Sequence, residues 1–120
     1  MELKQWQIFR FNQFDSRQGS DPIQPLDDNR PYRRFVIITP QRFLDKKLPK
    51  VTCVPIGEKA ANIFLQIPLV KGESGCNKDC HIWADEIYTL ESKWFDFNYG
   101  KLLDEKIILL KSAIADYLDI

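Results

Sequence analysis

Three arginines gather just before an apolar run in the first third of the chain. Arg30, Arg33 and Arg34 precede the run 35–38, which is rich in β-branched residues and is followed by Thr39-Pro40. Guanidinium groups form paired hydrogen bonds with phosphate and carboxylate oxygens, so such a cluster is suited to holding an anion. A solvated strand end, with arginine stems lying on apolar surface and charged heads in water, fits the same residues. The arginines alone leave both interpretations open.

Two carboxylates, Asp85 and Glu86, interrupt the apolar segment Cys80–Leu90. Strands disfavour carboxylates, so these side chains either contact something or lie at a bulge or a solvated edge. Arginines and a group that takes up a proton are enough for phosphoryl chemistry on RNA without a metal. The guanidinium would stabilise the charge of the transition state, and the second group would move the 2′-OH proton.

Thiols and imidazole occur together in Cys76-Asn77-Lys78-Asp79-Cys80-His81. Zinc is held by such ligands, but the C-x3-C spacing and the adjacent histidine depart from the usual zinc patterns. Cys53 is the only other cysteine, and we therefore expect free thiols and no metal. We interpret His81, the single histidine, as a hydrogen-bonded structural residue rather than a catalytic base.

Composition places the chain among ordinary globular domains. It has 120 residues, of which 44% are hydrophobic and 28% charged, and this predicts one domain over 1–120. The formal net charge is zero, although residues 1–50 carry ten Lys/Arg against six Asp/Glu and the remainder seven against eleven. This basic first part permits an anionic ligand. No apolar segment resembles a signal peptide or a membrane span, so we expect a cytoplasmic protein.

The apolar patterns predict short strands followed by one helix. Leu103, Ile107, Leu110, Ile114 and Leu118 recur at helical spacing, with Asp104 and Glu105 in the first turn. The segment 15–29 predicts a long loop that leads into the arginines. We predict an α+β fold, mainly β: an SH3-like, partly open antiparallel barrel of about five strands with a C-terminal helix. The expected strands are 4–14, 34–39, 51–56, 62–70 and 80–90.

Four segments together resemble the MazF/PemK toxins, which share the CcdB/MazF-like fold. They are Arg33–Pro40, Cys53-Val54-Pro55-Ile56, Asp79 with Trp83–Leu90, and Gly100-Lys101-Leu102-Leu103-Asp104-Glu105. They follow the order of the family's motifs and span most of the chain. The resemblance implies the toxin of a type II toxin–antitoxin system, a metal-independent endoribonuclease that cleaves single-stranded RNA. It also implies a cognate antitoxin, a homodimer and no cofactor.

The resemblance assigns roles residue by residue. The family's catalytic arginine falls on Arg33, with Arg30 and Arg34 as its electrostatic support. Asp21 matches an acidic loop residue, and Asp85 matches an aspartate implicated in RNA contact. We therefore predict Arg33, Asp21 and Asp85 as catalytic, and Arg30, Arg34, Thr52 and Glu86 as RNA-binding.

Gly57 stands where the family has its catalytic threonine or serine. Loss of that hydroxyl would lower the cleavage rate by orders of magnitude. Two alternatives therefore remain: a gyrase poison like CcdB, which the opening segment and Tyr32–Val36 also resemble, and a non-catalytic binding member of the fold. The gyrase-binding terminus Trp-Gly-Ile of CcdB is matched here only by the final residue, Ile120.

Overall fold

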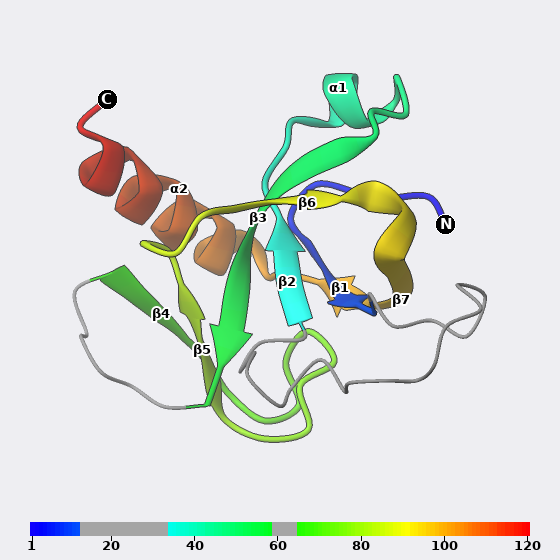
Figure 1. Ribbon diagram of the computed structural model, residues 1–120. Helices are drawn as coiled ribbons and strands as arrows, with labels where there is room; N and C mark the ends of the chain where they lie inside the picture. The colour runs from blue at the N-terminus through cyan, green and yellow to red at the C-terminus, as the bar shows by residue number, and fades with distance from the viewer. Residues whose placement is uncertain (13–33, 59–64) are drawn as a thin grey trace.

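The computed structural model describes residues 1–12, 34–58 and 65–120 of the chain. Within these ranges it contains seven strands, two α-helices and a short 3-10 helix at Ser92–Trp94 (Figure 1). The strands are β1 Gln7–Phe11, β2 Arg34–Ile37, β3 Lys50–Gly57, β4 Gln66–Leu69, β5 Cys80–Trp83, β6 Tyr88–Glu91 and β7 Phe95–Lys101; the helices are α1 Gln41–Leu44 and α2 Asp104–Leu118.

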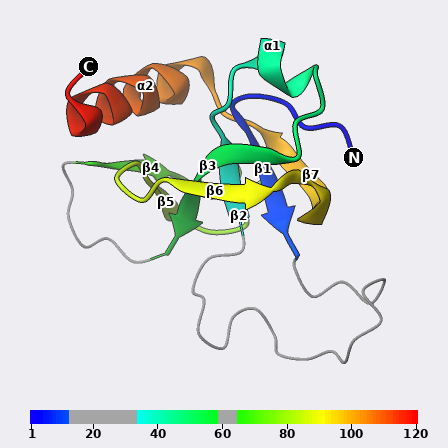
Figure 2. The same cartoon turned by 45° about the horizontal axis from the view of Figure 1, so that its top comes forward.

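The strands form one antiparallel sheet in the order β4-β5-β3-β2-β1-β7. Strand β3 has eight residues and pairs with two strands along the same edge: β5 through Ile56 and Gly57, and β6 through Lys50 to Cys53. The sheet is not closed into a barrel, in agreement with the prediction of a partly open antiparallel fold. Helix α2 lies across the β4–β5 part of the sheet and leaves β7 uncovered on that side (Figure 2).

Two hydrophobic clusters lie on opposite faces of the central strands, because successive side chains of a strand point to opposite sides. One cluster contains Ile8, Val36 and Val54, with Leu110 of α2. The other contains aromatic side chains of β1, β2 and β7: Phe9, Phe11, Phe35 and Phe95. All four rings are at most 2% exposed.

The C-terminal helix confirms the predicted periodicity in its middle. Leu110 is fully buried, and Ile107 and Ile114 pack against the same cluster. The outer members of the predicted stripe, Leu103 and Leu118, are each 47% exposed, so the packed surface is shorter than the apolar pattern. The part of the chain that the structure describes contains no helix long and apolar enough to cross a membrane.

Several predicted strand boundaries are wrong. The segment 80–90 is two strands, because a turn at Ala84 and Asp85 separates the part that pairs with Ile56 from the part that pairs with Cys53. Strand β7 was not predicted at all, and these two differences raise the strand count from about five to seven. The first strand begins at Gln7 rather than residue 4, and the second ends at Ile37 rather than residue 39. A short helix, α1, follows Pro40.

Candidate nucleic-acid interface

Strands β1 and β2 bring two arginines side by side. Arg10 and Arg34 are register partners in the antiparallel pair, as are Ile8 and Val36 two residues further along. Residues two apart share a face of a strand, so the arginines continue the face that carries Ile8 and Val36. This face of the β1–β2 pair is apolar at Ile8 and Val36, near α2, and cationic at Arg10 and Arg34.

Two irregularities in β7 place aromatic rings beside these arginines. Phe95 pairs with Phe11, whereas Phe97 pairs with Arg10, so Asp96 is an additional residue between them. A second register shift lies between Asn98 and Gly100, where Tyr99 is the additional residue. A bulge changes the face to which the following side chains point. Phe95 therefore packs in the buried aromatic cluster, while Phe97 accompanies Arg10 on the opposite face.

The four side chains form a continuous row, which we call the arginine–aromatic surface: Arg10, Phe97, Tyr99 and Arg34. The Arg10 Cζ lies 5.7 Å from the centroid of the Phe97 ring, and the Arg34 Cζ lies 4.5 Å from that of Tyr99. The two rings meet edge to face, with centroids 4.9 Å apart. Phe97 is 48% exposed, so part of its ring is open to solvent beside the two cations.

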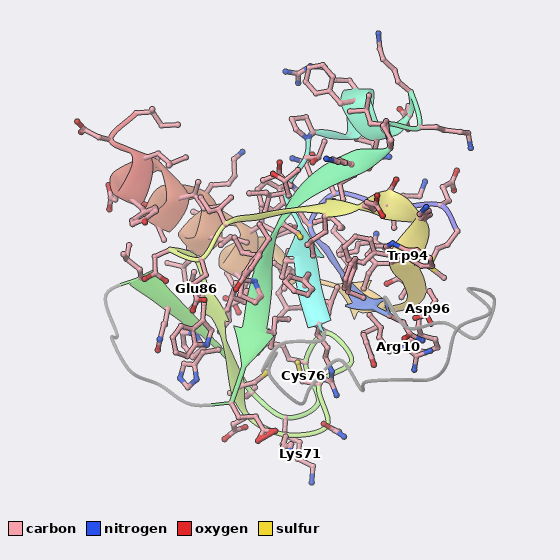
Figure 3. All side chains as sticks on the ribbon, viewed as in Figure 1. Arg10, Lys71, Cys76, Glu86, Trp94 and Asp96 are labelled. Atoms are coloured by element: carbon pink, nitrogen blue, oxygen red, sulfur yellow. The ribbon has the colours of Figure 1, made fainter. Side chains whose placement is uncertain are left out.

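Arg10 is held in place by β7. Its Nε donates a hydrogen bond to Oδ1 of Asp96 at 2.8 Å, its Nη2 donates to Oδ2 at 3.2 Å, and Asn12 also donates to Oδ2 at 3.0 Å. The hydrogen bond to Asp96 raises the pKa of Arg10 above its ordinary value, and Tyr99 adds to the shift. Figure 3 shows Arg10 and Asp96 next to each other at the β7 edge. The ion pair fixes the direction of the guanidinium and leaves its charge partly balanced.

The chemistry of this surface suits a single-stranded nucleic acid. Arginines contact backbone phosphates, and exposed aromatic rings stack with unpaired bases, each stacked base being worth about 1–3 kcal/mol. The surface offers both groups within one row of four side chains. Its only hydroxyl is the phenol of Tyr99.

The predicted arginine cluster is only partly described. Arg34 lies in the arginine–aromatic surface, whereas Arg30, Arg33 and Asp21 lie outside the described residues.

Thr52 lies at the other end of β3 from the arginines. Arg34 pairs with Ile56, and Thr52 is four residues further along the strand, about 13 Å at the usual rise per residue. Its backbone N–H donates to Oγ1 of Thr39 at 2.8 Å, and its Cα partner in β6 is Thr89. The structure thus does not bring Thr52 together with Arg34.

Asp85 and Glu86 lie between β5 and β6, not in the middle of a strand as predicted. The Tyr88 hydroxyl donates to Oε1 of Glu86 at 3.5 Å. Figure 3 shows Glu86 on the β4–β5 side of β3, and Arg10 with Asp96 on the opposite side of the sheet. The two carboxylates form a region separate from the arginine–aromatic surface.

Gly57 and His81 are Cα partners across β3 and β5. The His81 Nδ1 is buried and has no hydrogen-bond partner among the described residues, so the predicted hydrogen-bonded structural histidine is not found at this atom. The three cysteines are free thiols, as predicted. In residues 1–12, 34–58 and 65–120, no three His, Cys, Asp or Glu side chains lie together as metal ligands would.

Sequence reasoning missed Arg10, Phe97 and Tyr99. A signal was present, because Phe95, Phe97 and Tyr99 alternate with polar residues as strand residues do. The two bulges, which decide the face of each ring, have no comparable signature in the sequence.

Comparisons with known proteins identify the fold. No family profile and no curated protein matches this sequence. Among solved structures, the Mycobacterium tuberculosis toxin MazF-mt6 is similar at a TM-score of 0.72 and 18% identity, covering 95% of this chain and 97% of that one. MazF from Deinococcus radiodurans gives a TM-score of 0.73 at 10% identity, covering 100% and 99%.

A third similar structure is an endoribonuclease from a mycobacterial species in complex with its cognate antitoxin. It gives a TM-score of 0.71 at 13% identity, covering 97% of this chain and 94% of that one. The protein therefore has the MazF-like α+β fold over its whole length, as the sequence motifs predict.

Proposed function

We propose that this protein is the toxin of a toxin–antitoxin system and an endoribonuclease that cleaves single-stranded RNA without a metal ion. The arginine–aromatic surface carries the proposal, since it combines phosphate-binding cations with rings for base stacking. The fold supports it, because the similar solved structures include MazF toxins and an endoribonuclease with its antitoxin.

In this proposal Arg33 stabilises the negative charge that develops on the phosphate during cleavage. Arg10 and Arg34 bind the neighbouring backbone phosphates, and Phe97 and Tyr99 stack with bases. Asp21 is the proposed group that moves the 2′-OH proton, in place of the hydroxyl that Gly57 lacks, because Asp85 lies in a region separate from the arginine–aromatic surface.

We further propose a cytoplasmic homodimer that is inhibited by an acidic antitoxin segment. An acidic segment would compete with RNA for the same arginines, because both present negative charge to them. Helix α2 also has exposed apolar side chains that a second copy could cover: Ile108, Leu109, Tyr117 and Leu118 are between 47% and 67% exposed.

The test is cleavage of a single-stranded RNA oligonucleotide in the presence of EDTA. The wild-type chain should cut it, Arg33→Ala should abolish cutting with the fold intact by circular dichroism, and Arg34→Ala should weaken binding. Arg42→Ala is the matched control, because Arg42 also stacks on a ring, that of Phe43 at 4.7 Å, but on α1.

Other outcomes identify the alternatives. If the wild-type chain binds RNA without cutting it, even at high protein concentration, and Arg34→Ala loses that binding, the protein is a non-catalytic binding protein. RNA that neither binds nor is cut, together with trapping of gyrase on cleaved DNA, indicates a gyrase poison. Either result would overturn the ribonuclease proposal.

A further inference from the structure

Two cysteines lie side by side next to the arginine–aromatic surface. Cys76 ends the turn that follows β4, and Cys80 begins β5. The Cys80 thiol donates a hydrogen bond to the sulfur of Cys76, with 3.6 Å between the two Sγ atoms. Both residues are 5% exposed. A disulfide needs about 2.05 Å between the sulfurs, so bonding requires the two side chains to rotate toward each other.

The turn that carries Cys76 is fixed on both sides. The Ser74 hydroxyl donates to the carbonyl of Lys101 at 2.7 Å, and Gly75 packs so closely on β7 that a Cβ there would meet the Tyr99 carbonyl oxygen at 2.1 Å. Lys106 of α2 lies 3.9 Å from the Glu73 carboxylate and also donates to the Pro68 carbonyl. These contacts hold Cys76 in place, so its position beside Cys80 is part of the fold.

The charges around the pair favour one thiolate. The hydrogen bond from Cys80 lowers the pKa of Cys76 to about 7, with help from the positive charge of Arg34 and against burial and Glu73. The pKa of Cys80 is raised, mainly because its thiol is the donor in that hydrogen bond and is buried. The charge of Asp79 raises this pKa further, and that of Arg34 opposes the shift. Figure 3 shows Cys76 where β2 begins, at Arg34.

We propose that Cys76 and Cys80 form a peroxide-reactive dithiol site that closes to an intramolecular disulfide. Cys76 is the attacking thiolate and Cys80 is the resolving thiol. The oxidant is hydrogen peroxide or a small hydroperoxide, since both sulfurs are too buried for a bulky reagent.

The reaction balances in two steps. The Cys76 thiolate attacks one peroxide oxygen, the O–O bond breaks, and the leaving hydroxide takes a proton to become water, leaving a sulfenic acid. The Cys80 sulfur then attacks the Cys76 sulfur; the S–S bond forms, the S–O bond breaks, and hydroxide leaves with the Cys80 proton as a second water. The chain loses two hydrogens, and the peroxide is reduced.

Cys53 provides an internal comparison. It is 0% exposed, belongs to the aromatic cluster on the other face of the sheet, and its thiol donates to the Tyr88 carbonyl. Burial raises its pKa, so it has little thiolate to react. Cys53 should remain a thiol under conditions that oxidise the pair.

The test treats the reduced full chain with a small excess of hydrogen peroxide. The denatured product should be about 2 Da lighter, from the two hydrogens lost, with one free thiol left of the three cysteines. Trypsin cuts after Lys71, Lys78 and Lys93, so the disulfide should link peptides 72–78 and 79–93 until a reductant separates them. Cys53→Ala should give the same linked peptides, which makes it the matched control.

Variants distinguish the two roles. Cys80→Ser should stop at a sulfenic acid on Cys76, which dimedone traps when it is added together with denaturant, whereas Cys76→Ser should stay unmodified. Any of four outcomes in the wild-type chain would overturn the proposal: three remaining thiols, a sulfinic acid on Cys76, a link to Cys53, or a disulfide between chains. Cleavage of RNA is not part of this readout, so the dithiol site and the ribonuclease proposal stand or fall separately.

The pH dependence adds a second readout. The rate of peroxide reaction should rise with a midpoint near the Cys76 pKa of about 7, because only the thiolate attacks. Arg34→Gln should move that midpoint upward, since it removes the cation that favours the thiolate, and Arg42→Gln should not. An unchanged midpoint in Arg34→Gln would exclude the guanidinium from the site.

Discussion

The two faces of the β1–β2 pair use aromatic residues in opposite ways. On one face, Phe9, Phe11 and Phe35 are almost completely buried and meet edge to face with Phe95. On the other face, the apolar residues beneath α2 give way to Arg10 and Arg34, which stack on rings of β7. Strand alternation separates the two sets in β1 and β2, whereas in β7 a bulge does so.

The difference shows how this fold can build a stabilising core and a binding surface from the same strands. The aromatic cluster stabilises the sheet, and the same strands can then present cations and rings on the face that α2 leaves open. Substitutions on one face should therefore change the free energy of unfolding, and those on the other should change RNA binding.

The largest expected effect is on stability. Phe35→Ala removes a ring that is 2% exposed and contacts Phe11, Tyr88 and Phe95, so it should lower the free energy of unfolding by about 3–5 kcal/mol. Denaturant titration measures the loss, and Phe35→Leu should recover part of it. A loss below about 1 kcal/mol would mean that the aromatic cluster is not the stabilising core.

Tyr99→Ala should have the largest effect on RNA binding. It removes the ring that stacks under Arg34, and the loss of one stacked base corresponds to roughly 5- to 150-fold weaker binding. Fluorescence anisotropy with a labelled oligonucleotide measures the affinity. Tyr99→Phe keeps the ring and should bind nearly as the wild type does; equal losses in both variants would assign the effect to the hydroxyl instead.

Arg34→Gln should weaken binding through charge. Removing one phosphate contact should reduce the slope of log affinity against log salt concentration by about 0.7 for a single strand. Binding titrations at several salt concentrations give the slope, with Arg42→Gln as the control from the other arginine–ring pair. If both variants changed the slope equally, binding would be a property of general charge rather than of this surface.

The smallest expected effect concerns the ion pair of Arg10. Asp96→Asn keeps the shape of the side chain but removes its charge, and because the Arg10 side chain is 43% exposed the loss of stability should be only about 0.2–1 kcal/mol. RNA should bind slightly more tightly, since the guanidinium loses its competing carboxylate. Weaker binding would show that the fixed direction of Arg10 matters more than its charge.

The sequence predicted the order of elements well where apolar residues form continuous runs or a helical stripe, as in β2, β3 and the middle of α2. It failed at 80–90, because the two strands of that segment are both apolar and the turn between them contains no glycine or proline. Of the candidate site, Arg34 was predicted, whereas the rings beside it were not. Their position depends on bulges and on Gly100, whose φ of +135° is one that L side chains rarely adopt.

Photo-cross-linking of a single-stranded RNA oligonucleotide to the wild-type chain tests the central claim most directly. Trypsin releases Phe97 and Tyr99 together in peptide 94–101 and Phe43 in peptide 43–46. Mass spectrometry therefore distinguishes adducts on the arginine–aromatic surface from adducts on the ring beside Arg42. Nucleotide adducts on Phe97 or Tyr99, with peptide 43–46 unmodified, are the predicted result. Adducts on Phe43 to the same extent, or none in 94–101, would contradict an RNA-binding role for the arginine–aromatic surface.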